Sequence, residues 1–192
     1  MAGKPAMTTN PRSLQSRPAV FLDRDGTIID DRGHLSHPSQ VVFYPDTVPS
    51  LLKLQAHFSL FIVTNQSGVA KGIITLQDVA RVNGYVLAHL EQSGIRIADT
   101  YVCPHDRADD CLCIKPKPFF LKKAEAEHGI DLKRSFVIGD HPHDVAFGKD
   151  AGAGAIYVLS GHGMKHRHEL GRDTTVAGGI GEAADLVLKG AG

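Results

Sequence analysis

Two aspartates separated by a single residue, Asp23 and Asp25, directly follow the apolar run at residues 19–22. A carboxylate in such a position can attack a phosphoryl group. A second carboxyl nearby can hold or release a proton, because neighbouring acids favour different protonation states. The following Gly26 allows a plainer explanation, since Asp-Gly is a common turn sequence. The choice depends on the other polar residues that follow apolar runs.

Three further polar clusters stand where apolar runs end: Thr64, Asn65 and Gln66 after residues 60–63, Lys115 and Lys117 after residues 100–102 and a loop, and Asp140 and Asp144 after residues 136–138. Asp oxygens are hard ligands that suit Mg²⁺, and Lys and Thr can hold phosphate oxygens. If the clusters meet, they favour phosphate chemistry with a divalent metal.

The elements that must bring these clusters together are short apolar runs separated by helical patterns. Strands are predicted at residues 19–22, 60–63, 100–102, 136–138 and 155–159. Helices are predicted from the N-cap Asp46, from the capping box of Thr75 and Asp78, over 119–128, up to Ala151, and over 182–188 after a Gly-rich linker. This alternation predicts an α/β fold of Rossmann-like, doubly wound type, with a mainly parallel sheet of about five strands. Such sheets bind ligands beyond the carboxyl ends of their strands, where the polar clusters lie.

Composition limits the other possibilities. The 21 Lys and Arg residues balance the 21 Asp and Glu residues, which argues against a nucleic-acid binder with a basic face. No apolar run is long enough to suggest a membrane span, and residues 1–18 carry no apolar signal segment. We expect a mobile tail at 1–18, then one domain at 19–192 with a minimal cap, and a cytoplasmic monomer.

Cys103, His105, Cys111 and Cys113 offer three sulfur ligands and one nitrogen within a short loop. That donor set suits a tetrahedral Zn²⁺, and four protein ligands leave no place for a catalytic water, so the zinc would be structural. An odd, clustered set of cysteines is a poor disulfide framework and fits a reducing compartment. The alternative is a set of buried free thiols with His105 on the surface.

Together, these residues carry a resemblance to a known family. The segments DRDGT at 23–27, TNQ at 64–66, Lys115-Pro116, and Gly139-Asp140 with Asp144 resemble the four motifs of the haloacid dehalogenase superfamily. The stretches FLDRDGTI, TNQSGVAKG and CPH…CLCIKPKP are more closely similar to the group of D-glycero-D-manno-heptose 1,7-bisphosphate 7-phosphatases and histidinol-phosphate phosphatases. The similarity extends over roughly residues 19 to 160 of the doubly wound pattern.

The resemblance implies a phosphatase that works through an aspartyl-phosphate. Asp23 would be the nucleophile, and Asp25 would protonate the leaving alcohol and then activate water. Mg²⁺ would be held by Asp23, by the backbone carbonyl of Asp25 and by Asp140. The family also carries a structural zinc at the positions of the Cys/His loop.

The same resemblance gives roles to the remaining motif residues. Thr64 and the backbone N–H groups after it would bind phosphate oxygens, although Thr64 could serve only as a helix cap. Lys115 would hold both Asp23 and the phosphate; Lys117, which also precedes a proline, is the alternative. Asp144 would orient Lys115 or a metal-bound water, unless it is simply a residue at a helix N-terminus.

The substrate is less clearly indicated, because the Arg that precedes the motif lysine in the family is Ile114 here. That Arg is expected to help bind substrate phosphate. Arg24, Lys71 or Lys117 could compensate, and Asn65 and Gln66 are further candidates for substrate binding.

We favour the heptose bisphosphate as the small phosphorylated metabolite. A histidinol-phosphate phosphatase is the alternative, with Asp106, Asp109 or Asp110 as the anion for the substrate ammonium. A catalytically silent protein that binds a phosphorylated metabolite or another protein is the hypothesis from a different class. His141 and His143 flank the expected metal site, where each is either a substrate contact or a solvated loop residue. The His-rich stretch 162–168 fits a solvated loop, and a second metal or phosphate patch is the alternative.

Overall fold

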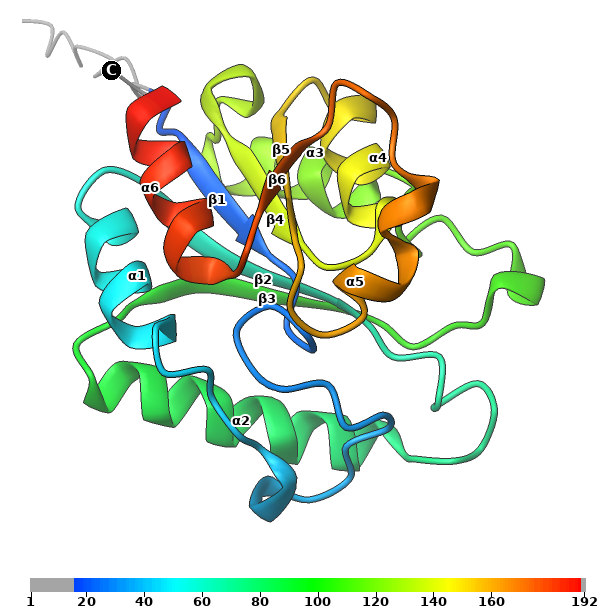
Figure 1. The fold of residues 1–192 in the computed structure, drawn as a ribbon. Coiled ribbons are helices and arrows are strands. Elements are labelled where there is room, and N and C mark those ends of the chain that lie inside the picture. The colour runs from blue at the N-terminus through cyan, green and yellow to red at the C-terminus, as the bar shows by residue number, and fades with distance from the viewer. Residues whose placement is uncertain (1–15, 191–192) are drawn as a thin grey trace, which may run out of the picture.

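The computed structural model describes residues 16–190, and its centre is one sheet of six parallel strands. Their order is β3-β2-β1-β4-β5-β6. The strands are β1 (Ala19–Leu22), β2 (Ser59–Asn65), β3 (Ile97–Cys103), β4 (Phe136–Gly139), β5 (Gly154–Val158) and β6 (Thr175–Ala177). The order reverses between β1 and β4, and in such a sheet the crevice at this switch point is where ligands bind. The predicted doubly wound fold is therefore confirmed (Figure 1).

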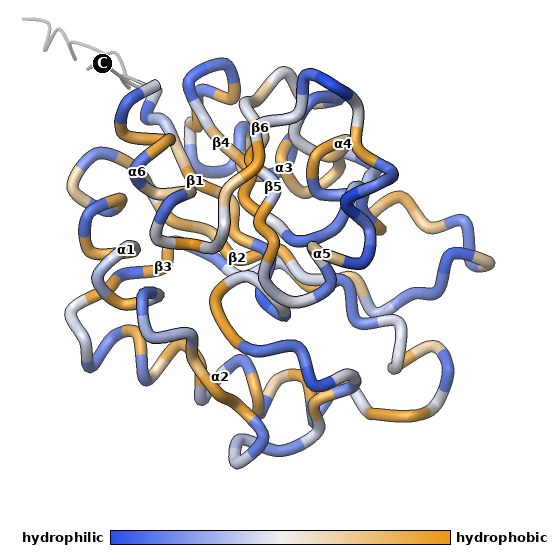
Figure 2. The backbone as a smooth tube through the Cα atoms, in the orientation of Figure 1, coloured by the Kyte–Doolittle hydropathy of each residue, from blue (hydrophilic) through white to orange (hydrophobic). Residues whose placement is uncertain are grey.

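Helices cover both faces of the sheet (Figure 1). One face carries α1 (Thr47–Gln55), α2 (Leu76–Gln92) and α6 (Ile180–Gly190), and the other carries α3 (Phe119–His128) and α4 (Pro142–Asp150). Successive residues of β1 alternate between the two cores, because strand side chains point to opposite faces. Val20 and Leu22 pack under α1, α2 and α6, whereas Ala19 and Phe21 pack under α3 and α4. Figure 2 shows the resulting apolar strands and the hydrophilic outer part of the loop after β3.

Short segments complete the fold beyond these helices. They are the four-residue helix α5 (Gly163–His166) and the 3₁₀ helices η1 (Pro38–Gln40), η2 (Arg107–Asp109), η3 (Leu132–Arg134) and η4 (Arg167–Glu169). The segment between β1 and α1 contains only η1 among these elements, so the described chain has a minimal cap over the strand ends. No helix within residues 16–190 combines the length and the apolar character that crossing a membrane requires.

Several local signals act as the sequence predicts. Thr75 and Asp78 form the expected capping box at the start of α2, with the Thr75 side chain accepting from the Asp78 N–H at 3.1 Å. Gly129 follows α3 in a left-handed conformation, with a φ of 64°. Asp46 precedes α1 but does not cap it through its side chain. Its Oδ2 instead accepts from the backbone N–H of Gly181 at 2.9 Å, which joins α1 to α6.

The structure differs from the predicted elements at three places. A sixth strand, β6, pairs with β5 although three residues bounded by turns gave no strand signal. Helix α6 begins at Ile180, inside the segment predicted as a linker. Of the expected tail, residues 1–15 lie outside the described residues. Arg17 donates to Gly129 O at 3.2 Å and Pro18 O accepts from Ser59 at 3.0 Å, so this part of the expected tail belongs to the folded body.

Candidate active site

The polar clusters predicted from strand ends meet in one cavity of about 360 Å³ at the carboxyl edge of the sheet. Its lining comes from the end of β2, the loops after β1 to β5 and the start of α4, and is mostly polar: Asp23, Asp25, Asp31, Gly33, His34, Thr64, Asn65, Gln66, Arg107, Lys115, Asp140, His141, His143, Asp144 and His162. Asp23 and Asp140 follow β1 and β4, the two strands at the switch point. The cavity size is typical of small-molecule sites.

Lys115 lies at the centre of this cavity and is only 4% exposed. Its Nζ donates to Asp23 Oδ1 at 2.5 Å, to Asp144 Oδ1 at 2.6 Å and to the carbonyl oxygen of Val63 at 3.0 Å. Two carboxylates and one carbonyl therefore take all three ammonium protons. Asp144 also accepts from the His141 N–H at 3.1 Å, so this carboxylate joins the first turn of α4 to the lysine.

The carboxylates around Lys115 carry more negative charge than the lysine balances. Burial raises the pKa of Asp23 to about 7; Lys115 opposes this shift, and Asp144 and Asp25 add to it. Burial, together with Asp23 and Asp144, raises the pKa of Asp140 to about 8. Buried carboxyls with raised pKa values are stabilised by a nearby cation, and hard carboxylate oxygens suit Mg²⁺. The donor set thus fits a divalent cation beside Asp23 and Asp140.

The backbone at Gly26 makes room for Asp140. Gly26 has a φ of +83°, and a Cβ at this position would lie 2.0 Å from Asp140 Oδ2. The same oxygen accepts from the backbone N–H of His162 at 2.7 Å, which holds the carboxylate toward the cavity. Only glycine permits this close approach between the loop after β1 and the loop after β4.

Asp25 is fixed by a buried arginine. Arg24, which is 0% exposed, donates from Nη2 to Asp25 Oδ2 at 2.7 Å and from Nη1 to Asn83 Oδ1 at 2.6 Å. Gln66 Nε2 donates to the same Asp25 oxygen and to Thr64 Oγ1, both at 2.8 Å. The structure does not bring Arg24, a predicted substrate ligand, into the cavity lining, and its guanidinium holds Asp25 instead.

The four predicted zinc ligands lie together at the end of β3. The Sγ atom of Cys103 is 3.6 Å from that of Cys111 and 3.2 Å from that of Cys113, and Nδ1 of His105 is 3.4 Å from the Cys113 sulfur. Tetrahedral Zn²⁺ with Zn–S bonds of about 2.3 Å separates its sulfur ligands by about 3.8 Å. These separations and the three-sulfur, one-nitrogen donor set fit a zinc ion.

Comparisons with known proteins agree with this geometry. The HAD-hydrolase-like family model matches residues 112–183. The D-glycero-beta-D-manno-heptose-1,7-bisphosphate 7-phosphatase of Helicobacter pylori is 34% identical over 161 residues, which cover 81% of this chain and 90% of the relative. The chain belongs to the haloacid dehalogenase-like phosphatases. A Pasteurella multocida protein with the same name as the H. pylori relative is 36% identical, over 69% of this chain and 76% of its own.

Solved structures show the same family relationship. The D,D-heptose 1,7-bisphosphate phosphatase of B. bronchiseptica, crystallised with magnesium and phosphate, has a TM-score of 0.83 and 26% identity over 91% of this chain and 99% of its own. A putative HAD-like phosphatase from Mesorhizobium loti has a TM-score of 0.72 and 34% identity, covering 76% of this chain and 74% of its own.

In this haloacid dehalogenase-like phosphatase, the zinc-ligand loop is joined to the segment after β2. The carbonyl oxygen of Cys103 accepts from the Gln66 N–H at 2.7 Å, and the Lys115 N–H donates to Asn65 Oδ1 at 3.2 Å. Both ends of the loop therefore contact residues that line the cavity. This arrangement places Lys115, rather than Lys117, beside Asp23.

The structure does not bring Lys71 and Lys117 to the cavity. Lys71 Nζ lies 3.1 Å from Asp106 Oδ2, and Lys117 Nζ lies 2.6 Å from Asp110 Oδ1, with all four side chains in the loop region outside the cavity lining. Ile114, which stands where the family resemblance leads us to expect an arginine, is 8% exposed and packs in the core under α3. Neither the lysines nor position 114 supplies a positive charge to the cavity.

Sequence analysis overlooked Arg107 and Asp31, and it left His141 and His143 open. All four line the cavity. Arg107 Nη2 donates to His143 Nδ1 at 2.7 Å, and the rings of His141 and His143 stack with their centroids 4.4 Å apart. Desolvation, with His143 adding to it, lowers the pKa of His141 to about 4, so the ring is neutral near pH 7. Arg107 lies on the loop between the zinc-ligand candidates His105 and Cys111, and only the folded position of that loop brings it to the cavity.

Proposed function

We propose that this protein is a Mg²⁺-dependent phosphatase that removes the 7-phosphate of D-glycero-D-manno-heptose 1,7-bisphosphate through an aspartyl-phosphate. The observation that supports this most directly is the buried group of Asp23, Asp140 and Asp144 around Lys115. Relatives that are 34% and 36% identical to this chain over the aligned residues carry that enzyme name. The site chemistry supports the phosphoryl transfer, and the relatives support the choice of sugar.

In the first step, a carboxylate oxygen of Asp23 attacks the phosphorus atom and the bond from phosphorus to the sugar oxygen breaks. Asp25 gives its proton to that leaving oxygen, so the sugar departs as a neutral alcohol. Arg24 and Gln66 hold Asp25 two residues from the nucleophile through bonds of 2.7 Å and 2.8 Å to Oδ2. This fixed position is what an acid that must meet the leaving oxygen requires.

In the second step, Asp25, now ionised, takes a proton from a water molecule as the water oxygen attacks phosphorus. The aspartyl oxygen–phosphorus bond breaks, inorganic phosphate leaves, and the carboxylate of Asp23 is restored. One water is consumed, and Asp25 ends the cycle protonated as it began. The same residue thus serves as acid and then as base.

The other cavity residues bind and orient the phosphoryl group. Thr64, whose Oγ accepts from Gln66, faces the cavity and can donate its hydroxyl proton to a phosphate oxygen. Lys115 keeps Asp23 in place from one side. Asp23, Asp140 and the backbone carbonyl of Asp25 would hold Mg²⁺. When bound there, Mg²⁺ supplies positive charge that offsets the repulsion between the carboxylates and the phosphoryl oxygens.

The zinc-ligand loop would supply the shape of the substrate site. With Zn²⁺ held by Cys103, His105, Cys111 and Cys113, the loop would be ordered although it contains few apolar residues. Because the ends of the loop form hydrogen bonds with Gln66 and Asn65, an ordered loop would also hold these two cavity residues in place.

Histidinol phosphate is the second candidate substrate, since only five residues separate His105 from Cys111, a short spacing like that of histidinol-phosphate phosphatases. Its ammonium group needs a carboxylate partner. Asp106 and Asp110 are each paired with a lysine, and Asp109 accepts from the Asp106 N–H at 2.7 Å. These loop aspartates are therefore already engaged, which favours the heptose bisphosphate.

The test is phosphate release with Mg²⁺ from heptose 1,7-bisphosphate, histidinol phosphate and common sugar phosphates in one panel. We expect kcat/KM to be highest for the heptose bisphosphate. Asp23→Asn should abolish turnover while the protein stays folded, because the amide cannot form the acyl phosphate. Preference for histidinol phosphate would transfer the proposal to that substrate. No release by folded, zinc-loaded protein would favour a silent binding protein.

A further inference from the structure

The cavity holds one positively charged residue that is not already paired with a carboxylate. Lys115 is engaged by Asp23 and Asp144. Among the described residues, Arg107 makes no ion pair within salt-bridge distance, and its side-chain hydrogen bond goes to the ring nitrogen of His143. A substrate with two phosphates needs a second cationic group away from the reacting phosphorus, and the cavity lining offers this one.

We propose that Arg107 forms a second anion subsite at the mouth of the cavity, which binds the phosphate of the substrate that is not hydrolysed. The proposal rests on the proposed function and adds a residue that selects bisphosphates over monophosphates. A guanidinium presents N–H donors in a fixed fork that matches phosphate oxygens, and Arg107 is exposed, so an anion can reach it.

The loop around Arg107 is fixed on both sides. Asp106 caps η2, with its Oδ1 accepting from the Ala108 N–H at 3.3 Å, and it pairs with Lys71. Asp110 ends η2 with a φ of 44° and pairs with Lys117. Arg107 is the first residue of η2, between these two anchors. Lys71 and Lys117, the predicted phosphate ligands, therefore form ion pairs with the two aspartates on either side of Arg107.

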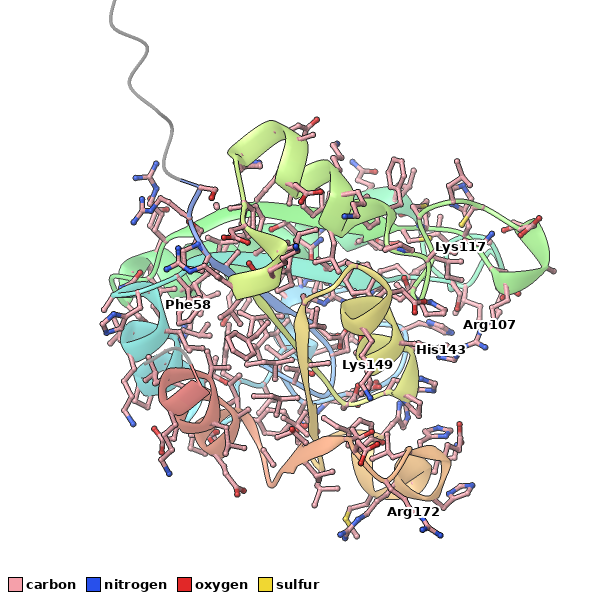
Figure 3. All side chains as sticks on the ribbon, turned by 90° about the horizontal axis from the view of Figure 1, so that it is seen from above. Phe58, Arg107, Lys117, His143, Lys149 and Arg172 are labelled. Atoms are coloured by element: carbon pink, nitrogen blue, oxygen red, sulfur yellow. The ribbon has the colours of Figure 1, made fainter. Side chains whose placement is uncertain are left out.

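His143 directs the guanidinium toward the cavity. It lies in the first turn of α4, and its Nδ1 accepts from Arg107 Nη2 at 2.7 Å (Figure 3). The His143 ring in turn stacks on His141 with an interplanar angle of 7°, which limits its rotation. One edge of the guanidinium is thus used for orientation, and its other N–H groups remain available to an anion. His143 is a positioning residue in this account.

The test compares a sugar bisphosphate with the matching monophosphate that lacks the second group. For Arg107→Ala, we expect kcat/KM for the bisphosphate to fall by about tenfold to a hundredfold, mainly through KM, because a charge-assisted contact is lost. The monophosphate should change by no more than about twofold, since the reacting site is untouched. Arg107→Lys should restore part of the loss, because a lysine keeps the charge and loses the fork.

Arg134→Ala is the matched control, because Arg134 is an exposed arginine in η3, at the opposite edge of the sheet. It should leave both substrates unchanged. His143→Ala should raise KM for the bisphosphate, and adding it to Arg107→Ala should have little further effect. An equal loss on both substrates, or no loss on either, would overturn the subsite.

The outcomes also separate this inference from the proposed function. If wild-type protein hydrolyses other esters but not heptose bisphosphate, the substrate proposal fails. The ratio of kcat/KM values for fructose 1,6-bisphosphate and fructose 6-phosphate then tests Arg107 on its own. A ratio that falls in Arg107→Ala supports the subsite with a different sugar, and an unchanged ratio rejects it.

Discussion

Stability without Mg²⁺ should decrease as the pH rises from about 6.5 to about 8. In this range the unfolded aspartates are already ionised, whereas native Asp23 and Asp140, with pKa values of about 7 and about 8, still bind protons. The native state therefore binds more protons than the unfolded state, and stability falls as pH rises. The lowered pKa of His141, about 4, acts in the opposite direction, mainly below about pH 7, where the unfolded histidine still binds protons. Within the chosen window it offsets only a small part of the decrease.

The size of the decrease follows from the two pKa values. Titration of Asp23 and Asp140 across this window removes about 2 kcal/mol from the free energy of unfolding. For a chain of this length, that corresponds to a fall in melting temperature of about 4–8 °C. Mg²⁺ binds the ionised carboxylates, so saturating Mg²⁺ should cancel most of the decrease, and its stabilising effect should be larger at the higher pH.

Thermal unfolding at about pH 6.5, 7.2 and 8 measures this directly. The protein should be exchanged into Mg²⁺-free buffer rather than treated with a chelator, which would also remove zinc. Asp140→Asn is the control, because it lacks one titrating carboxyl and one proposed Mg²⁺ ligand; its decrease should be smaller and its response to Mg²⁺ weaker. A melting temperature that stays constant or rises with pH without Mg²⁺ would refute the reasoning, as would a Mg²⁺ effect that is independent of pH.

Three further changes test the supporting structure. Purified protein should contain about one zinc ion per chain, and Cys111→Ser should lower both the zinc content by elemental analysis and the melting temperature; equal stability of zinc-free protein would contradict a structural zinc. Arg24→Met should lower the free energy of unfolding, measured with denaturant, by about 3–5 kcal/mol and should also lower kcat, because Asp25 loses its buried partner. Arg24→Lys should not rescue kcat. A wild-type kcat in Arg24→Met would contradict the role assigned to Arg24. Gly26→Ala should weaken Mg²⁺ activation by more than about tenfold, because its Cβ displaces Asp140; an unchanged Mg²⁺ titration would show that the two loops adjust freely.

The sequence predicts the position of the site because strand ends are strong signals. Asp23, Thr64 and Asp140 each follow an apolar run that is predicted to be a strand. If these strands are parallel, their carboxyl ends lie at one edge of the sheet, and the three residues meet there. The zinc-ligand loop is equally readable, since its donor types and spacing are a local property. β6 was missed because Thr175–Ala177 is too short for a periodic signal, and it is a strand only because β5 offers it a partner.

Partner choice among charged side chains could not be predicted. Lys71, Lys117 and Arg24 are positive residues near the motifs, and spacing alone cannot tell a substrate ligand from a residue that pairs with a carboxylate. Burial decides the role of Arg24, which is fully enclosed beside Asp25. Loop conformation decides the role of the lysines and places Arg107, which carries no sequence signal, in the cavity wall.

The segment 106–110 begins and ends beside zinc ligands, His105 and Cys111, and is braced by Lys71 and Lys117. Its outer residues have few contacts with the sheet, whereas the neighbouring Cys103 and Lys115 are bonded to the segment after β2. Substitutions at 107–109 can thus alter the cavity mouth while the positions of Asp23 and Lys115 stay unchanged. With the proposed subsite at Arg107, the loop would be a replaceable recognition module, in which evolution or a protein engineer could exchange substrate preference without rebuilding the chemistry beneath it.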